Sequence, residues 1–211
     1  MNLLIVAATR FEIEPFIRHK KGADVLITGV GIPATMYHLT QKLLTGKYDL
    51  AIQAGIAGTF SGKYPLGEVV VVKEDTFADL GIEEQGKMQT LFEAGFLLKD
   101  SFPFSGGWLV NPQPLLKGIS LPLARAVTIN KISDNDAQIK LITEKFKADT
   151  ESMEGAAFYY VCLQQKINFL QIRSISNTVG QRDKSKWKLK ASIENLNKEL
   201  LKIVDHLQNA V

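Results

Sequence analysis

An acidic residue at the expected start of a helix is the first group in this sequence that could do chemistry. Glu154 directly precedes an apolar run that includes Ala156, Ala157, Tyr160 and Val161, and helix-favourable acids lie just upstream. The unpaired amides and the dipole of a helix N-terminus favour a negative side chain at such a position. Glu154 is therefore a candidate for a fixed, ionised acceptor of ligand hydroxyl groups. The alternative is an acid that only stabilises the helix.

Two further polar residues follow apolar runs that we expect to be strands. Glu12 lies in the turn after the first of these runs, and a carboxylate there could accept a proton from water. Asn177 ends the last run, and its side-chain amide offers both a donor and an acceptor. Taken singly, Glu12 could be a surface acid near a helix start and Asn177 a turn residue.

Glycine-rich turns follow two other expected strands, at residues 29–35 and 55–59. Glycine at the carboxyl end of a strand lets the backbone approach a ligand closely, and open α/β sheets bind ligands at that edge. The first turn lacks the third glycine of a dinucleotide-binding motif and the acidic residue that should follow it. The sequence also has no Gly-Lys-Ser/Thr phosphate loop. We therefore expect a small-molecule site of another kind.

The elements that must position these groups form an alternating pattern. Helices are expected over residues 33–44 and 193–207, and a third helix, capped by Ser133 or Asp134, carries Ile139, Ile142 and Phe146 on one side. Six apolar runs predict strands covered on both faces: residues 3–8, 25–30, 50–56, 68–72, 126–132 and 168–176. Together they predict a single α/β domain over residues 1–211, a three-layer α/β/α sandwich with a central, mostly buried mixed sheet.

Residues 86–123 differ from the rest, because glycines, prolines and five aromatic residues interrupt any regular pattern. A long punctuated stretch of this kind is more often functional than idle. We expect it either to close over the site or to pack on a second subunit.

Composition excludes several classes of partner. The chain has 211 residues, 45% of them hydrophobic, and a net charge of only +3, as in one soluble globular domain. No basic run is interleaved with aromatic residues, so no nucleic-acid partner is expected. The single cysteine, Cys162, reads as a buried hydrophobe, and the three histidines are too scattered for a metal site. No stretch has the length of a membrane span or the form of a signal peptide, so we expect no membrane association and a cytoplasmic protein.

Four blocks occur in an order that resembles the purine nucleoside phosphorylase and nucleosidase superfamily: Glu12, Gly55-x-Ala57-Gly58, Ser152-Met153-Glu154-x-x-Ala157 and Arg173-x-Ile175-Ser176-Asn177. The resemblance covers nearly the whole chain, and within the superfamily it is greatest to the futalosine hydrolases of the menaquinone pathway. It implies a nucleoside phosphorylase/hydrolase-like fold. It also implies an enzyme that needs no metal and no organic cofactor.

The resemblance assigns a role to each block in cleaving an N-glycosidic bond through an oxocarbenium-like transition state. Glu12 would orient and deprotonate water, Met153 would pack against the ribose, and Glu154 would accept hydrogen bonds from the ribose hydroxyls. Glu154 would also stabilise the developing positive charge. Asn177 would act at the leaving base. The other implied substrate-binding residues are Ile56, Ala57, Gly58, Ser152, Ser176 and Arg182.

Two departures from the superfamily narrow the expected reaction. Phosphorylases carry an Arg near the position of Gln53, and a neutral amide cannot supply a charge-assisted phosphate contact. Water is then the expected nucleophile. Methylthioadenosine/adenosylhomocysteine nucleosidases carry Asp where this chain has Asn177, and an Asn suits a 6-oxopurine such as hypoxanthine. An Asn cannot be a general acid, so the leaving base would need its proton from solvent or from tautomeric assistance.

The expected reaction is therefore the hydrolysis of futalosine to hypoxanthine and dehypoxanthine futalosine. The carboxylate that futalosine carries beyond its ribose needs a cation, and the sequence leaves Arg10 and Arg182 as candidates. Trp187 could stack near the site or anchor its loop.

Three alternatives to this reaction remain: a methylthioadenosine/adenosylhomocysteine nucleosidase, a phosphorylase, and a nucleoside-binding protein without catalysis. The family habit predicts a homodimer or larger homo-oligomer, in which a neighbouring chain could complete the pocket. The hypothesis requires Glu12 and Glu154 in one cavity, with neither buried against an internal cation.

Overall fold

A mixed β-sheet forms the centre of the computed structural model, which describes residues 1–19, 22–60, 62–111 and 119–209. The strands run in the order β10-β4-β8-β9-β3-β1-β2, and β7 pairs with β4 at the side. Their bounds are β1 Leu3–Ala7, β2 Asp24–Ile27, β3 Leu50–Thr59, β4 Val69–Asp75, β7 Leu109–Val110, β8 Leu123–Thr128, β9 Thr150–Ser152 and β10 Asn168–Thr178. Because β3 pairs with β1, β9 and β10, part of the sheet closes on itself.

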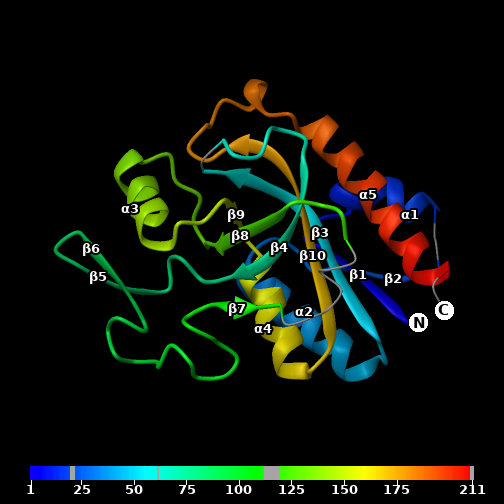
Figure 1. Ribbon diagram of the computed structural model, residues 1–211, viewed down its shortest axis with the longest axis horizontal. Coiled ribbons are helices and arrows are strands. Elements are labelled where there is room, and N and C mark those ends of the chain that lie inside the picture. Colours follow the sequence, from blue (N-terminus) through cyan, green and yellow to red (C-terminus); the bar gives the residue numbers. More distant parts are fainter. Residues whose placement is uncertain (20–21, 61, 112–118, 210–211) are drawn as a thin grey trace.

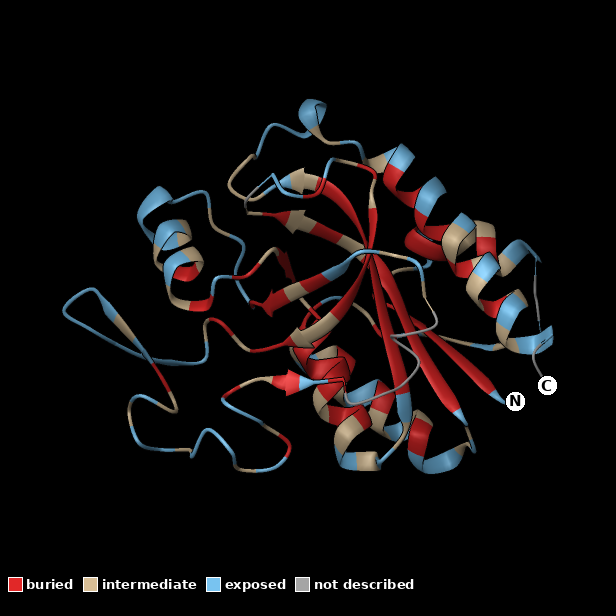
Figure 2. Ribbon diagram, in the orientation of Figure 1, coloured by how far each residue is buried: buried red, intermediate tan, exposed pale blue. Residues whose placement is uncertain are grey.

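Helices cover both faces of this sheet, as the sequence predicts (Figure 1). On one face lie α1 (Arg10–His19) and α5 (Leu189–Asn209), and on the other lie α2 (Ile32–Thr45) and α4 (Gly155–Gln165). Each pair of helices seals its own apolar core against the strands. The sheet strands between them are largely buried (Figure 2), and all five residues of β1 are. The predicted α/β sandwich with a mostly buried mixed sheet is confirmed.

Three local expectations need correction. The strand expected over residues 126–132 is β8, which ends at Thr128 because Asn130 turns away to bond Asp79. Helix α3 (Asp136–Phe146) is capped by Asn135, whose side chain accepts from the Gln138 amide, and not by Ser133 or Asp134. Strand β9 was not predicted at all. Its three residues lie in the acidic stretch that reads as the approach to a helix.

The segment 86–123 forms no part of the wall of the site in the residues that the structure describes. It contributes β6 (Lys87–Thr90), which pairs with β5 (Gly81–Glu84) in a hairpin that extends away from the sheet (Figure 1). Three of its five aromatic side chains make edge-to-face ring contacts, Phe92 with Phe104 and Trp108 with Phe146 of α3, whereas Phe96 and Phe102 are exposed. The expected lid is therefore not observed in the described part, and residues 112–118 lie outside it.

Two further expectations concern single features. Cys162 is buried, as predicted, and burial raises the pKa of its thiol well above the usual value. None of the helices in the described part of the chain combines the length and apolar character needed to cross a bilayer.

Candidate active site

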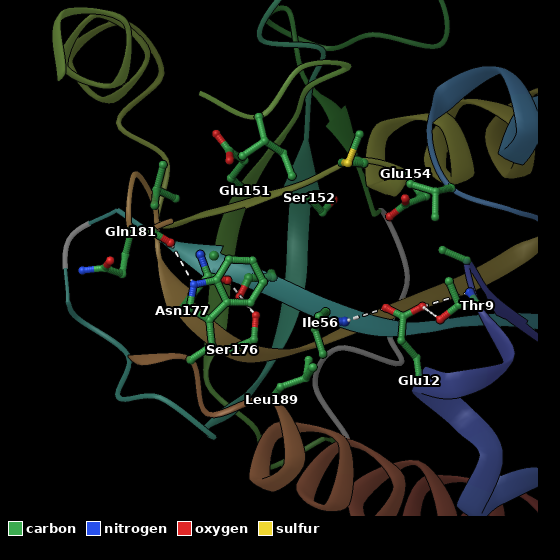
Figure 3. A pocket seen from close by; sticks show the side chains of 18 of the residues that line it. Thr9, Glu12, Ile56, Glu151, Ser152, Glu154, Ser176, Asn177, Gln181 and Leu189 are labelled. Atoms are coloured by element: carbon green, nitrogen blue, oxygen red, sulfur yellow. Dashed lines mark hydrogen bonds between the residues drawn. The ribbon is translucent and has the colours of Figure 1, made fainter. Parts of the chain in front are cut away.

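A cavity of about 320 Å³ opens where β1, β3 and β10 end at the same edge of the sheet. The residues to which the resemblance assigns a catalytic or binding role all lie on its wall: Glu12, Ile56, Ala57, Gly58, Ser152, Met153, Glu154, Ser176, Asn177 and Arg182. In Figure 3, Glu12 and Glu154 lie toward one end of this pocket, and Asn177 and Gln181 toward the other. The first requirement of the hypothesis, that both acids share one cavity, is met.

Glu12 is held by three hydrogen-bond donors in a fixed orientation. Its Oε2 accepts from the backbone amide and the hydroxyl of Thr9, both at 2.9 Å, and its Oε1 accepts from the Ile56 amide at 3.1 Å. It lies in the first turn of α1 and not in the connecting turn before the helix, where it was expected. α1 is kinked at Ile13, two residues before Pro15. The side chain thus lines the cavity while its position is fixed by β3.

Glu154 stands at the predicted helix start, but its carboxylate does not cap its own helix. It is the N-cap of α4 with no side-chain capping bond, and its Oε1 instead accepts from the Gly31 amide at 3.0 Å. Gly31 is itself the N-cap of α2. Burial raises the pKa of Glu154, whereas the nearby Arg173 and the bonds from Gly31 and Met153 oppose that shift. The carboxylate therefore lies at the cavity between two helix N-termini.

An internal cation lies beside this carboxylate, which corrects the second requirement of the hypothesis. Arg173 is 1% exposed, and its Nη1 is 3.6 Å from Glu154 Oε2. Its Nη2 donates to Gln53 Oε1 at 3.0 Å, and its Nη1 donates to the Ile56 carbonyl at 3.4 Å. Two buried acids on one cavity wall are stabilised by a compensating charge. Excluding any internal cation was therefore the wrong requirement, because Glu154 keeps its place on the cavity wall with Arg173 behind it.

Residues 55–59, expected to be a glycine turn after a strand, instead continue strand β3 (Leu50–Thr59), and Gly31 and Gly55 serve neighbouring side chains. A Cβ on Gly55 would lie 2.4 Å from Arg173 Nη1 and 3.1 Å from Glu12 Oε1. Gly55 therefore makes room for the buried guanidinium and not for a ligand, contrary to the close approach expected there. Gly31, with φ +94°, adopts the conformation that points its amide at Glu154.

Asn177 lies at the end of β10 with both sides of its amide engaged. Its Oδ1 accepts from the Ser176 hydroxyl at 2.8 Å, and its Nδ2 donates to the Thr178 carbonyl at 3.0 Å. The side chain leans over Gly58, because Nδ2 is 3.3 Å from the point that a Cβ on Gly58 would occupy. These two hydrogen bonds give Asn177 a defined orientation on the wall of the pocket.

Of the two arginines left open by the sequence, only one faces the cavity. Arg182 is exposed on the loop after β10 and lines the pocket. Arg10 does not line it, and its Nε pairs with Glu14 Oε2 at 2.7 Å. Trp187 both lines the pocket and anchors this loop, because its Nε1 donates to the Gln181 carbonyl at 2.8 Å.

A comparison with known proteins places this geometry in a family. Residues 7–209 match the model of the phosphorylase superfamily. The chain belongs to the phosphorylase superfamily. It is 30% identical to the futalosine hydrolase of Thermus thermophilus, over 95% of this chain and 94% of the relative. It is 27% identical to the 5'-methylthioadenosine/S-adenosylhomocysteine nucleosidase of Shewanella halifaxensis, over 75% and 70%. The futalosine hydrolase structure from Helicobacter pylori superposes with a TM-score of 0.80 at 18% identity, covering 98% of both chains.

Within this superfamily, the departure at Gln53 has a structural counterpart. Gln53 is buried behind the pocket, where its side chain bonds to Arg173 and does not reach the cavity. Among the described lining residues, the only Lys or Arg is Arg182, which is exposed on the far loop. The part of the chain that the structure describes holds no group of three His, Cys, Asp or Glu side chains that could bind a metal ion.

Sequence reasoning missed one acid in this pocket of the phosphorylase superfamily. Glu151 lies in β9 and is 9% exposed, with its side chain on the cavity wall. It belongs to the acidic stretch that reads as helix-favourable, so its type and position were visible but its strand was not. Its short strand carries no periodic pattern, so the sequence holds no clear signal that would have placed it in the pocket.

Proposed function

We propose that this chain is an N-ribosyl hydrolase that cleaves futalosine to hypoxanthine and dehypoxanthine futalosine. The observation that carries the proposal is the placement of Glu12 and Glu154 on one cavity wall, with no cation near them that faces the cavity among the described lining residues. A hydrolase needs a base for water and a group that stabilises the sugar cation, but no phosphate holder. The 30% identity to a futalosine hydrolase over nearly the whole chain supports the substrate.

In this proposal Glu12 and Glu154 act on different parts of the reaction at the sugar. Glu12, fixed by Thr9 and Ile56, takes the proton of the attacking water. Glu154 accepts bonds from ribose hydroxyls and offsets the positive charge that develops on the ring, an effect that grows when water is excluded. Arg173 balances the charge of Glu154 from behind. Met153 packs its thioether against the ribose, and residues 56–58 lie beside the sugar and base.

The leaving base and the distal carboxylate are placed at the other end of the pocket. Asn177 presents its amide to a 6-oxopurine, with Ser176 fixing its orientation. Arg182, and not the paired Arg10, meets the carboxylate that futalosine carries beyond its ribose. Ser152 lies beneath Met153 and accepts from the Gly155 amide, which fixes the turn that carries Met153 and Glu154.

A homodimer or larger assembly, in the cytoplasm, is part of the proposal. An apolar cleft of about 350 Å³ lies between α2 and the segment 90–104, and Phe102 on its rim is 65% exposed. Val30, at the start of α2, is exposed and lines the catalytic cavity. A second copy seated on this cleft would lie next to the active site.

Chromatography of futalosine reaction mixtures, with and without phosphate, tests the function. We expect equal hypoxanthine release in both, and a fall of about 10²- to 10⁴-fold in kcat for Glu12→Gln. Substrate binding by this variant should remain within about threefold. Glu14→Gln, on the same helix but paired outward with Arg10 and Arg18, is the matched control and should keep full activity.

Other outcomes decide between the alternatives. Faster adenine release from methylthioadenosine or adenosylhomocysteine would favour the second candidate function, which the 27% identity to such a nucleosidase suggests. Acceleration by phosphate with formation of a sugar 1-phosphate would identify a phosphorylase. Equal turnover by native enzyme and Glu12→Gln would remove Glu12 from the mechanism.

A further inference from the structure

One row of residues crosses the floor of the pocket from β9 to β10. Gly58 of β3 is the register partner of Glu151 on one side and of Asn177 on the other. Side chains of directly paired residues share a face of the sheet. Because neighbouring strands are spaced at about 4.8 Å, the Cα atoms of Glu151 and Asn177 lie roughly 10 Å apart. Gly58 has no side chain, but Val179 Cγ2 and Asn177 Nδ2 lie 3.0 and 3.3 Å from the point that a Cβ there would occupy. The slot is therefore the part of the pocket above this row, bordered by the Glu151 carboxyl group and the Asn177 amide.

The slot lies at the end of the pocket away from the sugar-binding acids. Figure 3 shows Glu151 and Asn177 toward one end and Glu12 and Glu154 toward the other. A planar base attached to a ribose held by Glu12 and Glu154 would extend into this slot. Glu151 and Asn177 are then the two polar side chains that face each other across the base.

Glu151 has no role in holding the protein together that its contacts reveal. It is 9% exposed and lines the cavity, and in the described part of the chain no hydrogen-bond donor or cation meets its carboxyl group. Burial, and to a smaller extent the negative charge of Asp79, raise the pKa of Glu151 to about 7. Asp79 is itself held by the amide and side chain of Asn130. A buried carboxyl group without a partner inside a cavity is suited to a ligand.

The proposed hydrolysis leaves one proton without a donor. The departing base takes the electron pair of the C1′–N9 bond and needs a proton on a ring nitrogen to leave as a neutral purine. Asn177 cannot supply this proton because its amide does not ionise. Glu12 and Glu154 lie at the sugar and are assigned to water and to the ribose hydroxyls.

We infer that Glu151 is the general acid that protonates the departing base, an inference that rests on the proposed hydrolase function. The protonated Glu151 carboxyl gives its proton to the base as the C1′–N9 bond breaks. Water attacks C1′ and gives a proton to Glu12. The step ends with Glu151 ionised and Glu12 protonated, and exchange with solvent restores both. Asn177 holds the base in the slot while the proton moves.

The test is the pH dependence of futalosine hydrolysis in three variants. Native kcat/KM, which reports the pKa values of the free enzyme, should fall as pH rises past about 7, where Glu151 loses its proton. Glu151→Gln should lose about 10²- to 10⁴-fold in kcat with little change in KM, and its alkaline fall should disappear. Glu151→Asp should retain part of the activity and the alkaline fall. Asp79→Asn should move that fall to lower pH, because removing a negative neighbour lowers the pKa of Glu151.

Controls separate this role from others. Glu144→Gln, an exposed acid on α3, should leave the profile unchanged. Glu151 has no hydrogen-bond or ion-pair partner among the described residues, so the thermal midpoint of Glu151→Gln should stay near that of the native protein. If Glu151→Gln does not fold, the pH profiles of Glu151→Asp and Asp79→Asn decide whether Glu151 is the general acid.

Several results would overturn the inference. In Glu151→Gln, a kcat within about threefold of native, a loss confined to KM, or a retained alkaline fall would each do so. If Glu12→Gln is inactive and Glu151→Gln is not, the hydrolase proposal stands and this inference fails. If the native enzyme releases no hypoxanthine from futalosine, both fail.

Discussion

The carboxylates of the pocket differ in their surroundings, and the difference suits them to different tasks. Glu12 accepts three hydrogen bonds and is fixed before substrate arrives. Glu154 accepts one from Gly31 and lies beside the guanidinium of Arg173. Glu151 has neither kind of partner in the part of the chain that the structure describes, and burial raises its pKa to about 7. In the proposed mechanism these three residues act as a base, an electrostatic stabiliser and an acid, and their environments rather than their residue types set the roles apart.

Asn177 is the residue at which a single substitution tests the choice of base. In Asn177→Asp the Nδ2 donor to Thr178 is replaced by an oxygen that faces the same carbonyl, so the carboxyl must turn or take up a proton. A protonated or acceptor Asp suits a 6-aminopurine. We expect the ratio of kcat/KM for 6-oxopurine over 6-aminopurine nucleosides to fall about tenfold or more, measured in competition.

A second asparagine provides the control for this substitution. Asn195 on α5 also donates its amide to a backbone carbonyl, that of Gly67, and does not line the pocket. Asn195→Asp should therefore lower stability without changing the ratio. An unchanged ratio in Asn177→Asp would contradict the assignment of this side chain to the 6-oxopurine edge.

At the scale of elements, the position of Glu12 depends on a kink in α1 that α5 stabilises. An undistorted helix would bond the Phe16 amide to the Glu12 carbonyl. Here the side chain of Asn197 lies between them: its Oδ1 accepts from Phe16 at 3.0 Å, and its Nδ2 donates to Glu12 at 2.8 Å. A side chain inserted into the helix ladder in this way is a known cause of kinks. Asn197 thus holds the turn that presents Glu12 to the cavity.

Replacing Asn197 should therefore affect stability and turnover together. Asn197→Ala leaves the Phe16 amide and the Glu12 carbonyl buried without partners, at a cost of about 1–3 kcal/mol each. We expect a lower denaturant midpoint and a fall of about tenfold in kcat, with KM little changed, because Glu12 loses its orientation. Lys198→Ala, exposed on the next position of α5, is the control. Native kcat in a destabilised Asn197→Ala would separate the kink from catalysis.

At the scale of the whole molecule, the sequence predicts what depends on local pattern and misses what depends on distant partners. β1 was predictable because both its faces are buried and its apolar run is unbroken. β10 was predictable from its apolar and β-branched residues, although Gln171 and Arg173 interrupt them. The edge of the sheet that carries the site was predictable from these strands, because parallel strands bring their carboxyl ends together. The placement of Arg173 was not predictable, since a charged residue in a buried strand is tolerated only through Gln53 and Glu154, far away in sequence. β9 was missed because its three residues carry no periodic signal and pair with β3 and β8.

An exposed apolar surface beside the candidate active site suggests that two copies of this chain associate. Phe102 is 65% exposed on the rim of the cleft between α2 and the segment 90–104. Large exposed apolar patches usually mark a binding surface, and burying one such ring contributes about 2 kcal/mol. Light scattering at micromolar concentration should give about 47 kDa, twice the 23.4 kDa of one chain.

Lysine substitutions at two equally exposed apolar residues test where the interface lies. Phe102→Lys should shift the mass toward 23.4 kDa, and it should lower activity if the partner completes the pocket, because a charge cannot be buried in an apolar cleft without a counter-ion. Leu44→Lys changes an equally exposed residue, also 65%, at the other end of α2 and away from the cleft. It should leave mass and activity unchanged. A native mass of one chain would place the active site entirely within one subunit. Dissociation by Leu44→Lys alone would show that the interface lies elsewhere.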